Sequence, residues 1–307
     1  MSTELHPEVR AFLDALNAGF PDVTEHEPAA LREMVLSRRG PLEAEPPMAE
    51  VHDVTIDGPG GDLALRIFRP TTDTDLPVIV YAHGGGFVFC NLDTHDEFCR
   101  TIAKEVGALV ISVDYRLAPE HPAPAAHDDF HAAVRWAAEH AAEYGGDPAR
   151  IAVAGDSAGG NLAATVALAA RDHGPDLVGQ VLIYAVIDDD LDTESYRKFG
   201  VGYYNTTKAM GWYWEQYAPG DRNDPRIIPT VADSLAGVAP AVVVSAELDP
   251  PCSSNNAYAE RLAADGVRVL HKQYDGLFHG FFTFPALSLT GPARQELFAM
   301  IRELLGA

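Results

Sequence analysis

The first 50 residues are mostly polar, and their apolar positions recur at helical spacing. Val9, Phe12, Leu13 and Leu16 lie at i, i+3, i+4 and i+7, which predicts an amphipathic helix. The same spacing predicts a second helix over 28–37. Two interpretations of this segment stay open, an extension packed on a core and part of a lid over a pocket, because spacing alone does not separate them.

From residue 51 the pattern changes to short apolar runs that are typical of strands. Residues 51–56 and 63–68 alternate around a Gly-Pro-Gly-Gly turn, which predicts an antiparallel hairpin. Apolar runs then alternate with helical segments, and this order predicts an α/β fold with a mostly parallel sheet covered on both faces. The predicted strands are 78–82, 108–113, 150–154, 178–184, 241–246 and 267–274, and the predicted helices are 97–106, 126–144, 160–170, 256–264 and 292–305.

The alternation of strands and helices stops between residues 187 and 233. This segment is too long for a plain connection, and we interpret it as an insertion that can cover a site. It favours an apolar pocket of limited depth, suited to acetyl to hexanoyl groups rather than long lipids. Its aromatic residues are Tyr196, Phe199, Tyr203, Tyr204, Trp212, Tyr213, Trp214 and Tyr217.

Composition excludes several classes of protein. The 307 residues include 45 Asp and Glu against 22 Lys and Arg, a net charge of −23. This charge argues against nucleic acid or an anionic membrane as a partner, because both need a basic surface. Three cysteines without a Cys-x-x-Cys pair indicate neither a disulfide framework nor a zinc site. No signal sequence or membrane-spanning run is recognisable, so we expect a cytoplasmic protein without membrane insertion.

The most informative motif is Gly-Asp-Ser-Ala-Gly at residues 155–159. It follows the predicted strand 150–154 and precedes a predicted helix. A Gly-x-Ser-x-Gly motif between a strand and a helix forms a nucleophile elbow, whose sharp turn strains the serine backbone and holds its hydroxyl clear of the sheet. This context favours Ser157 as a nucleophile over a structural serine in a turn.

A serine nucleophile needs a base, and the base needs a partner that fixes its tautomer. In sheet-and-helix hydrolases the acid and then the histidine follow the serine, on loops after later strands. Asp249 and His279 have that location, since they follow the last two predicted strands. Glu247 is the alternative acid. His271 falls within a predicted strand, and residues 188–190 have the character of a solvated acidic run.

Ester chemistry at a serine also needs backbone N–H donors for the oxyanion, each worth on the order of 3 kcal/mol of barrier. We expect one from Ala158, directly after the nucleophile at a helix N-terminus. The glycines of His83-Gly84-Gly85-Gly86 follow the strand 78–82 and offer the others, because their backbone is free of side chains. His83 itself is interpreted as a structural residue that holds this loop.

Four motifs in order carry a family resemblance. They are His-Gly-Gly-Gly at 83–86, Asp-Tyr-Arg-Leu-Ala-Pro-Glu-His-Pro at 114–122, Gly-Asp-Ser-Ala-Gly at 155–159 and Asp-Gly-Leu-Phe-His-Gly-Phe at 275–281. From about residue 51 to the C-terminus the chain resembles the microbial hormone-sensitive-lipase family of α/β-hydrolase carboxylesterases. The resemblance implies an eight-stranded sheet with one antiparallel strand. It also implies hydrolysis of short- to medium-chain acyl esters with no cofactor or metal, and many members form homodimers.

The resemblance also implies roles for single residues and a division of the chain. The catalytic residues are Ser157 as nucleophile, Asp249 as acid and His279 as base, with Gly84, Gly85 and Ala158 as oxyanion donors. Residues 1–50 supply N-terminal cap helices, and 51–307 form the catalytic domain, with 187–233 as a cap insertion. Candidates to line the pocket are Phe87, Tyr204 and Trp212, although ordinary core packing explains each equally well.

The chain departs from the family pattern at positions that bear on the shape of the pocket. Pro251-Cys252-Ser253 stands where Leu-x-Asp usually follows Asp-Pro, Ala185 where proline is common, and Cys90 where glycine is frequent. None of these differences removes a catalytic group. The proline-rich segment 114–124 is interpreted as scaffolding, in which Arg116 and Glu120 are expected to pair.

Three functions are consistent with these motifs. The leading hypothesis is a serine carboxylesterase that works through an acyl-enzyme. An amidase, deacetylase or lactonase acting on a specialised metabolite would use the same triad, because the cap selects the leaving group. The third is a ligand-binding protein on a hydrolase scaffold. His279 argues against it, since receptors that resemble this family have lost that histidine.

Overall fold

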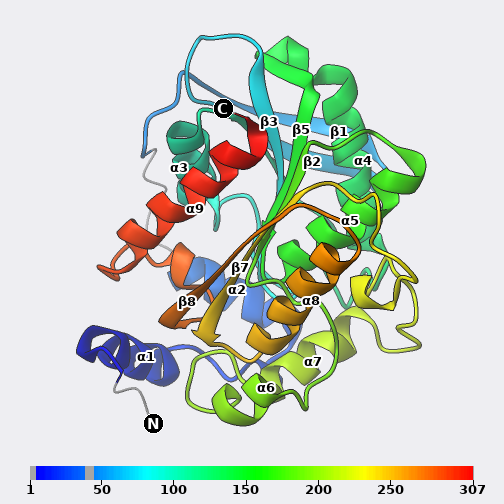
Figure 1. Cartoon of the computed structure of the whole chain (residues 1–307). Helices are drawn as coiled ribbons and strands as arrows, with labels where there is room; N and C mark the ends of the chain where they lie inside the picture. Colours follow the sequence, from blue (N-terminus) through cyan, green and yellow to red (C-terminus); the bar gives the residue numbers. More distant parts are fainter. Residues whose placement is uncertain (1–4, 39–44, 307) are drawn as a thin grey trace.

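The computed structural model describes residues 5–38 and 45–306. The strands in this part of the chain form one eight-stranded sheet. The strands lie in the order β1-β2-β4-β3-β5-β6-β7-β8 (Figure 1). β2 is antiparallel to both neighbours and the other pairs are parallel, so the predicted single antiparallel strand is confirmed. The bounds are β1 Glu50–Gly58, β2 Gly61–Arg69, β3 Leu76–Ala82, β4 Leu109–Val113, β5 Gly146–Asp156, β6 Gly179–Ile183, β7 Ala241–Leu248 and β8 Val269–Phe278.

Helices cover both faces of the sheet, as the alternation of elements predicts. α3 and α9 lie on one face, and α4, α5 and α8 lie on the other (Figure 1). The bounds are α3 Asp96–Val106, α4 Ala125–His140, α5 Ala158–His173, α8 Cys252–Ala264 and α9 Thr290–Leu305. The predicted helix 126–144 ends earlier, at His140, and continues as a 3₁₀ turn over Ala141–Tyr144. None of the helices in the described parts of the chain combines the length and the apolar character needed to cross a bilayer.

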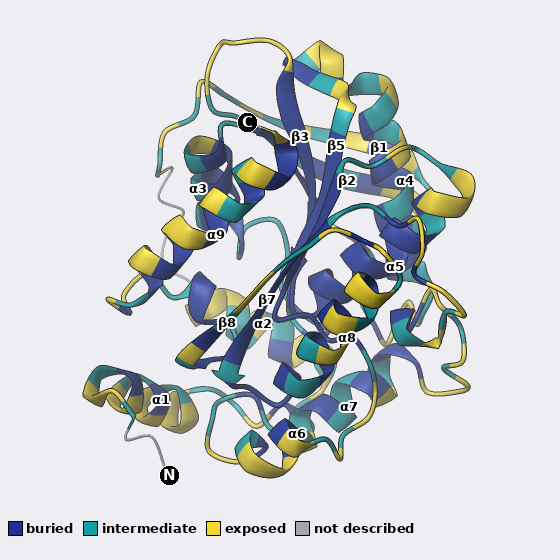
Figure 2. Cartoon of the chain, in the orientation of Figure 1, coloured by how far each residue is buried: buried dark blue, intermediate teal, exposed yellow. Residues whose placement is uncertain are grey.

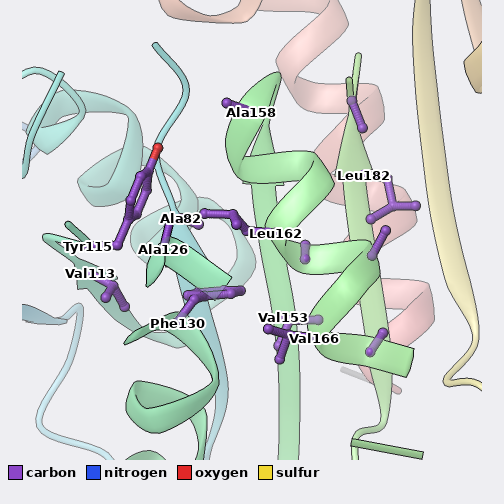
Figure 3. Close-up of a cluster of buried hydrophobic side chains, with 14 of the residues drawn as sticks. Ala82, Val113, Tyr115, Ala126, Phe130, Val153, Ala158, Leu162, Val166 and Leu182 are labelled. Carbon is purple, nitrogen blue, oxygen red and sulfur yellow. The ribbon is translucent and has the colours of Figure 1, made fainter. Parts of the chain in front are cut away.

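Side chains along the central strands alternate between two apolar layers. In β3, Val78, Val80 and Ala82 belong to the layer under α4 and α5, and Ile79 and Tyr81 belong to the layer under α3 and α9. Every residue of β3 is buried, and the dark centre of the sheet is visible in Figure 2. Figure 3 shows the first layer, in which α4 and α5 meet the sheet through Ala126, Phe130, Leu162 and Val166 against Ala82, Val113, Val153 and Leu182.

Four helices lie beyond the carboxyl ends of the parallel strands (Figure 1). They are α1 Pro7–Gly19, α2 Pro28–Arg38, α6 Glu194–Phe199 and α7 Thr207–Tyr217. Asn17 of α1 binds the loop between α6 and α7. Its Nδ2 donates to the carbonyl of Gly202 at 2.8 Å, and its Oδ1 accepts from the N–H of Tyr204 at 3.1 Å. The described parts of the first 50 residues therefore contact the 187–233 segment.

The ion pairs of segment 114–124 differ from the expected Arg116–Glu120 pair. Arg116 donates to both carboxylate oxygens of Asp129 at 2.8 Å, because this aspartate is buried in α4 and requires a countercharge. Glu120 instead accepts from Arg32 of α2 at 2.9 and 2.6 Å. The expected pair is therefore wrong, and Glu120 attaches α2 to the body of the protein.

A buried histidine makes the stability of the fold depend on pH. His127 lies between α4 and α5, with its Nδ1 3.0 Å from Oγ1 of Thr165. Burial lowers the pKa of His127 from 6.5 to about 3. Between those values the unfolded chain binds more protons than the folded chain, so the free energy of unfolding rises with pH and falls on acidification. We expect His127→Gln to flatten this dependence between pH 6.5 and 4, measured by denaturant unfolding.

The matched control is His173→Gln, because His173 is exposed at the end of α5. This variant should keep the pH dependence of the wild-type protein. A slope that is the same in His127→Gln and in the control would contradict the assignment.

Candidate active site

Ser157 lies in a tight turn between β5 and α5. Its backbone has φ 55° and ψ −117°, a conformation that costs energy for a residue with a side chain. The helix can begin here because Gly159 has no side chain, since a Cβ at that position would lie 1.9 Å from the carbonyl oxygen of Ala82. The elbow predicted from the Gly-x-Ser-x-Gly motif therefore has the expected geometry.

The structure brings Ser157 together with both residues expected to act with it. Nε2 of His279 lies 2.8 Å from Oγ of Ser157, and Nδ1 of the same ring lies 2.7 Å from Oδ2 of Asp249. Asp249 directly follows β7 and His279 directly follows β8. The loops after two parallel strands thus meet the elbow at one edge of the sheet.

The competing residues lie elsewhere. Glu247 accepts the N–H of Gly276 at 2.7 Å, so it stabilises the irregular part of the β7–β8 pairing. His271 is exposed in β8 and contacts Asn256 at 3.0 Å. Neither residue lies against Ser157, in agreement with the preference for Asp249 and His279.

The charge on Asp249 depends on its neighbours. Burial raises the pKa of its carboxyl, while the facing His279 and the Asn205 amide lower it. The Asp249 side chain is fully buried, and a carboxylate in such a position requires partners of this kind. The arrangement can fix the tautomer of His279, leaving Nε2 free to take a proton from the serine hydroxyl.

Asp156, next to the nucleophile, holds the glycine-rich loop. Its Oδ1 accepts from the N–H of Gly84 at 2.9 Å and from the hydroxyl of Tyr81 at 2.7 Å, and Nε2 of His95 lies 3.2 Å away. Burial raises the pKa of Asp156, but His95 and Tyr81 outweigh this effect, and the net pKa is lowered. The buried carboxylate is therefore stabilised by donors from three segments.

The expected role of Gly84 as an oxyanion donor does not fit this geometry, because Asp156 already accepts its N–H. A Cβ at Gly84 would also lie 2.4 Å from Oδ2 of Asp156, which explains the glycine there. The next two residues, Gly85 with φ 108° and Gly86 with φ 61°, line the cavity beside Ser157. Gly86 therefore takes the place of Gly84 among the candidate donors, with Gly85 and Ala158.

His83 is structural, as expected. Its ring is fully buried and stacks on Tyr115 with the centroids 4.3 Å apart, and its Nδ1 lies 2.7 Å from the carbonyl of Gly84. Burial lowers the pKa of His83 to about 3, so the ring is neutral at physiological pH. The hydroxyl of Tyr115 donates to the carbonyl of His83 at 2.8 Å and completes the support of the loop.

A cavity of about 310 Å³ opens beside Ser157 and His279. Phe87 and Tyr204 line it, as predicted. Trp212 is not among the lining residues, and that prediction is wrong. In α7 the cavity is lined by Ala209, Met210, Tyr213 and Trp214, whereas Trp212 lies on another side of the helix because successive residues are about 100° apart.

Strained backbone gathers around this cavity. Apart from Asp75, the described non-glycine residues with positive φ all lie at the site. Four of them line the cavity, and the fifth, Tyr184, has its ring 5.0 Å from that of His279. The four lining residues are Phe87, Cys90, Ser157 and Tyr204. Burial also raises the pKa of the Cys90 thiol to about 12, so it behaves as a small apolar group.

Sequence reasoning missed His95 and Asn205, which both line the cavity. Neither belongs to a motif whose chemistry points to the site, and both reach it through tertiary contacts.

Within the described residues no group of three or more His, Cys, Asp or Glu side chains is arranged to hold a metal ion. The site therefore consists of a serine, a histidine, two buried aspartates and a glycine loop around an apolar cavity.

Known proteins share this sequence and architecture. A family model described as alpha/beta hydrolase fold, Abhydrolase_3, matches residues 79–283. The carboxylesterase NlhH of Mycobacterium tuberculosis is 41% identical over 95% of this chain and 92% of its own length. The carboxylic ester hydrolase LipN of the same species is 44% identical over 76% of this chain, and the match spans 64% of LipN.

Solved structures agree with the sequence matches. The ester hydrolase EH1AB1 from the metagenome of Lake Arreo has a TM-score of 0.93 and 39% identity, over 99% of this chain and 100% of that chain. A more distant relative has a different function: the gibberellin receptor GID1 of Oryza sativa subsp. japonica is 34% identical over 76% of this chain and 72% of its own length. In this chain the His279 ring lies within hydrogen-bond distance of both Ser157 and Asp249.

Removing the Asp156 carboxylate tests its role in holding the glycine loop. In Asp156→Ala the N–H of Gly84 and the ring of His95 lose a buried partner, so we expect the free energy of unfolding to fall by about 3 kcal/mol. Ester turnover should fall as well, because the loop is no longer fixed beside Ser157. Denaturant unfolding and kcat measure the two effects.

The control is Asp172→Ala, which removes an exposed ion pair with Arg171. That change should cost less than about 1 kcal/mol. Equal losses of stability in the two variants would show that Asp156 does not support the loop.

Proposed function

The chain belongs to the Abhydrolase_3 family of α/β hydrolases, and from this premise we propose that it cleaves short- to medium-chain acyl esters through an acyl-enzyme on Ser157. It is a carboxylic ester hydrolase, as are its relatives at 41% and 44% identity. The observation that supports the proposed mechanism is the continuous contact from Oγ of Ser157 through the His279 ring to Asp249.

The proposed reaction has two acyl-transfer steps. Oγ of Ser157 attacks the ester carbonyl carbon while Nε2 of His279 takes the hydroxyl proton, and the N–H groups of Gly85, Gly86 and Ala158 stabilise the oxyanion. The bond to the alcohol oxygen then breaks, and His279 gives its proton to the leaving alcohol. Water attacks the acyl-enzyme, passes a proton to His279 and releases the carboxylic acid, after which the proton returns to Ser157.

The size and lining of the cavity support a small acyl group. Its volume of about 310 Å³ lies at the lower end of the range for small-molecule sites. Most of its lining side chains are apolar or aromatic, among them Phe20, Met210 and Tyr213. This supports acyl chains from acetyl to hexanoyl.

We propose that residues 1–50 and 187–233 together form a cap on the catalytic domain of residues 51–307. Residues 1–4 and 39–44 of the first segment lie outside the described residues. Support comes from the lining of the cavity, to which α1 contributes Leu16 and α7 contributes Tyr213. The homodimer and the cytoplasmic location stay predictions from the sequence.

The first test is the acyl-enzyme itself. Mixing the enzyme with p-nitrophenyl acetate should give a burst of p-nitrophenol equal to the concentration of active sites, followed by a slower steady rate. Ser157→Ala should lose the burst and at least about 1,000-fold in kcat. The exposed control Ser234→Ala should keep both. Full activity in Ser157→Ala would refute the mechanism.

The second test concerns acyl length. Tyr213→Ala enlarges the cavity, so the ratio of kcat/KM for octanoate to that for butyrate esters should rise by about tenfold. Trp212→Ala on the same helix does not touch the cavity and should leave the ratio unchanged. If N-acetyl amides or lactones were cleaved faster than every ester in the panel, the alternative amidase, deacetylase or lactonase activity would be favoured.

A further inference from the structure

The aspartate of the triad has one oxygen without a partner. Asp249 is fully buried, and its Oδ2 lies against Nδ1 of His279. Its Oδ1 has no hydrogen-bond partner among the described residues. A buried carboxylate oxygen without a donor is costly, and nothing on that side fixes the rotation of the carboxylate that orients His279.

The sequence after Asp249 explains why this donor is missing. An aspartate commonly accepts a hydrogen bond from the backbone N–H two residues further on. Here Pro250 and Pro251 follow, and neither has a backbone N–H. The next N–H, that of Cys252, donates to the main-chain carbonyl of Asp249 at 3.0 Å and not to its side chain. The turn therefore offers the carboxylate no local donor.

An amide from the 187–233 segment lies close to the Asp249 carboxyl group. Asn205 is buried and lines the cavity, and its amide lowers the pKa of the Asp249 carboxyl by hydrogen bonding. This contact does not meet the combined distance and angle of an ordinary hydrogen bond, since Oδ1 of Asp249 has no such partner among the described residues. Nδ2 of Asn205 instead donates to Sδ of Met210 at 3.3 Å, and a thioether is a weak acceptor. An amide NH2 has two donor hydrogens, so this weak contact leaves donor capacity for Asp249.

The backbone around Asn205 is held from two sides. Its own N–H donates to the carbonyl of Tyr203 at 2.9 Å, and Asn17 of α1 binds the adjoining residues Gly202 and Tyr204. Tyr204 has a φ of 71°, so the segment is held in a strained turn. The amide is therefore presented to the triad by a fixed piece of backbone.

We propose that Asn205 is a positioning residue that donates to Oδ1 of Asp249 and replaces the backbone donor that Pro251 cannot supply. Through this contact it fixes the rotation of the carboxylate and so the orientation of the His279 ring toward Ser157. The inference rests on the proposed roles of Ser157, His279 and Asp249. In this proposal a residue of the 187–233 segment, outside the α/β sheet, helps to orient the triad.

The test compares kcat and KM for p-nitrophenyl butyrate across a set of variants. Asn205→Ala should lower kcat about tenfold with a change of less than twofold in KM, because the substrate still binds but His279 is less well oriented. Asn205→Asp keeps the shape and replaces the donor by a second carboxylate, so it should lower kcat further than Asn205→Ala. The exposed control Asn223→Ala, from the same segment, should match the wild-type enzyme.

Restoring the backbone donor provides the decisive comparison. Pro251 has φ −71° and ψ 3°, which alanine adopts readily, so Pro251→Ala adds an N–H without a change of backbone. In the Pro251→Ala background, Asn205→Ala should cost less than about threefold in kcat. An undiminished tenfold loss in that background would overturn the proposal, as would wild-type kcat in Asn205→Ala alone.

A second route is independent of the fold of the Pro251→Ala variant. In an Asp249→Ala background Asn205→Ala should have little further effect on kcat, because the acceptor oxygen on which it acts is absent. Additive losses would indicate a purely structural role for Asn205 and overturn the proposal. Ser157→Ala distinguishes failure of the proposed mechanism from failure of this inference. Activity that survives in Ser157→Ala refutes the mechanism. If activity depends on Ser157 but Asn205→Ala keeps the wild-type kcat, only this inference is refuted.

Discussion

The close approach of α5 to the end of β3 is the constraint on which the site depends. Only glycine can stand at position 159, because any side chain there would collide with the carbonyl of Ala82. This contact makes the chain turn sharply at Ser157 and places the N-terminus of α5 beside the loop that follows β3. One backbone contact therefore brings together the serine, the helix N-terminus and the glycines that face it.

Two buried aspartates then serve the site in different ways. Asp156 has donors from Tyr81, Gly84 and His95, so its charge is balanced and it holds the glycine loop in place. Asp249 contacts the ring of His279 through Oδ2, and its Oδ1 has no hydrogen bond of ordinary geometry among the described residues, so its effect is directed at that ring. The difference follows from the surroundings, because both groups are carboxylates buried at the same end of the sheet.

The parts of the chain beyond the strand ends determine the shape of the pocket. One side of α7 and the end of α1 line the cavity, and the linking hydrogen bonds of Asn17 join these segments. The strained conformations of Phe87 and Tyr204 lie along the same cavity. Such conformations persist only where the surrounding structure over-determines them, so the two layers of apolar core below the site also maintain its geometry.

The sequence by itself determined the alternating order of strands and helices, the elbow at Ser157, and the location of Asp249 and His279. These features depend on local periodicity and on residues that directly follow strands, and both can be read along the chain. Only the tertiary structure decided that the N–H of Gly84 is taken by Asp156, that Trp212 lies away from the cavity, and that Arg116 pairs with Asp129. Each of these depends on a neighbour that is distant in sequence or on the direction in which one side of a helix points, and no local pattern specifies either.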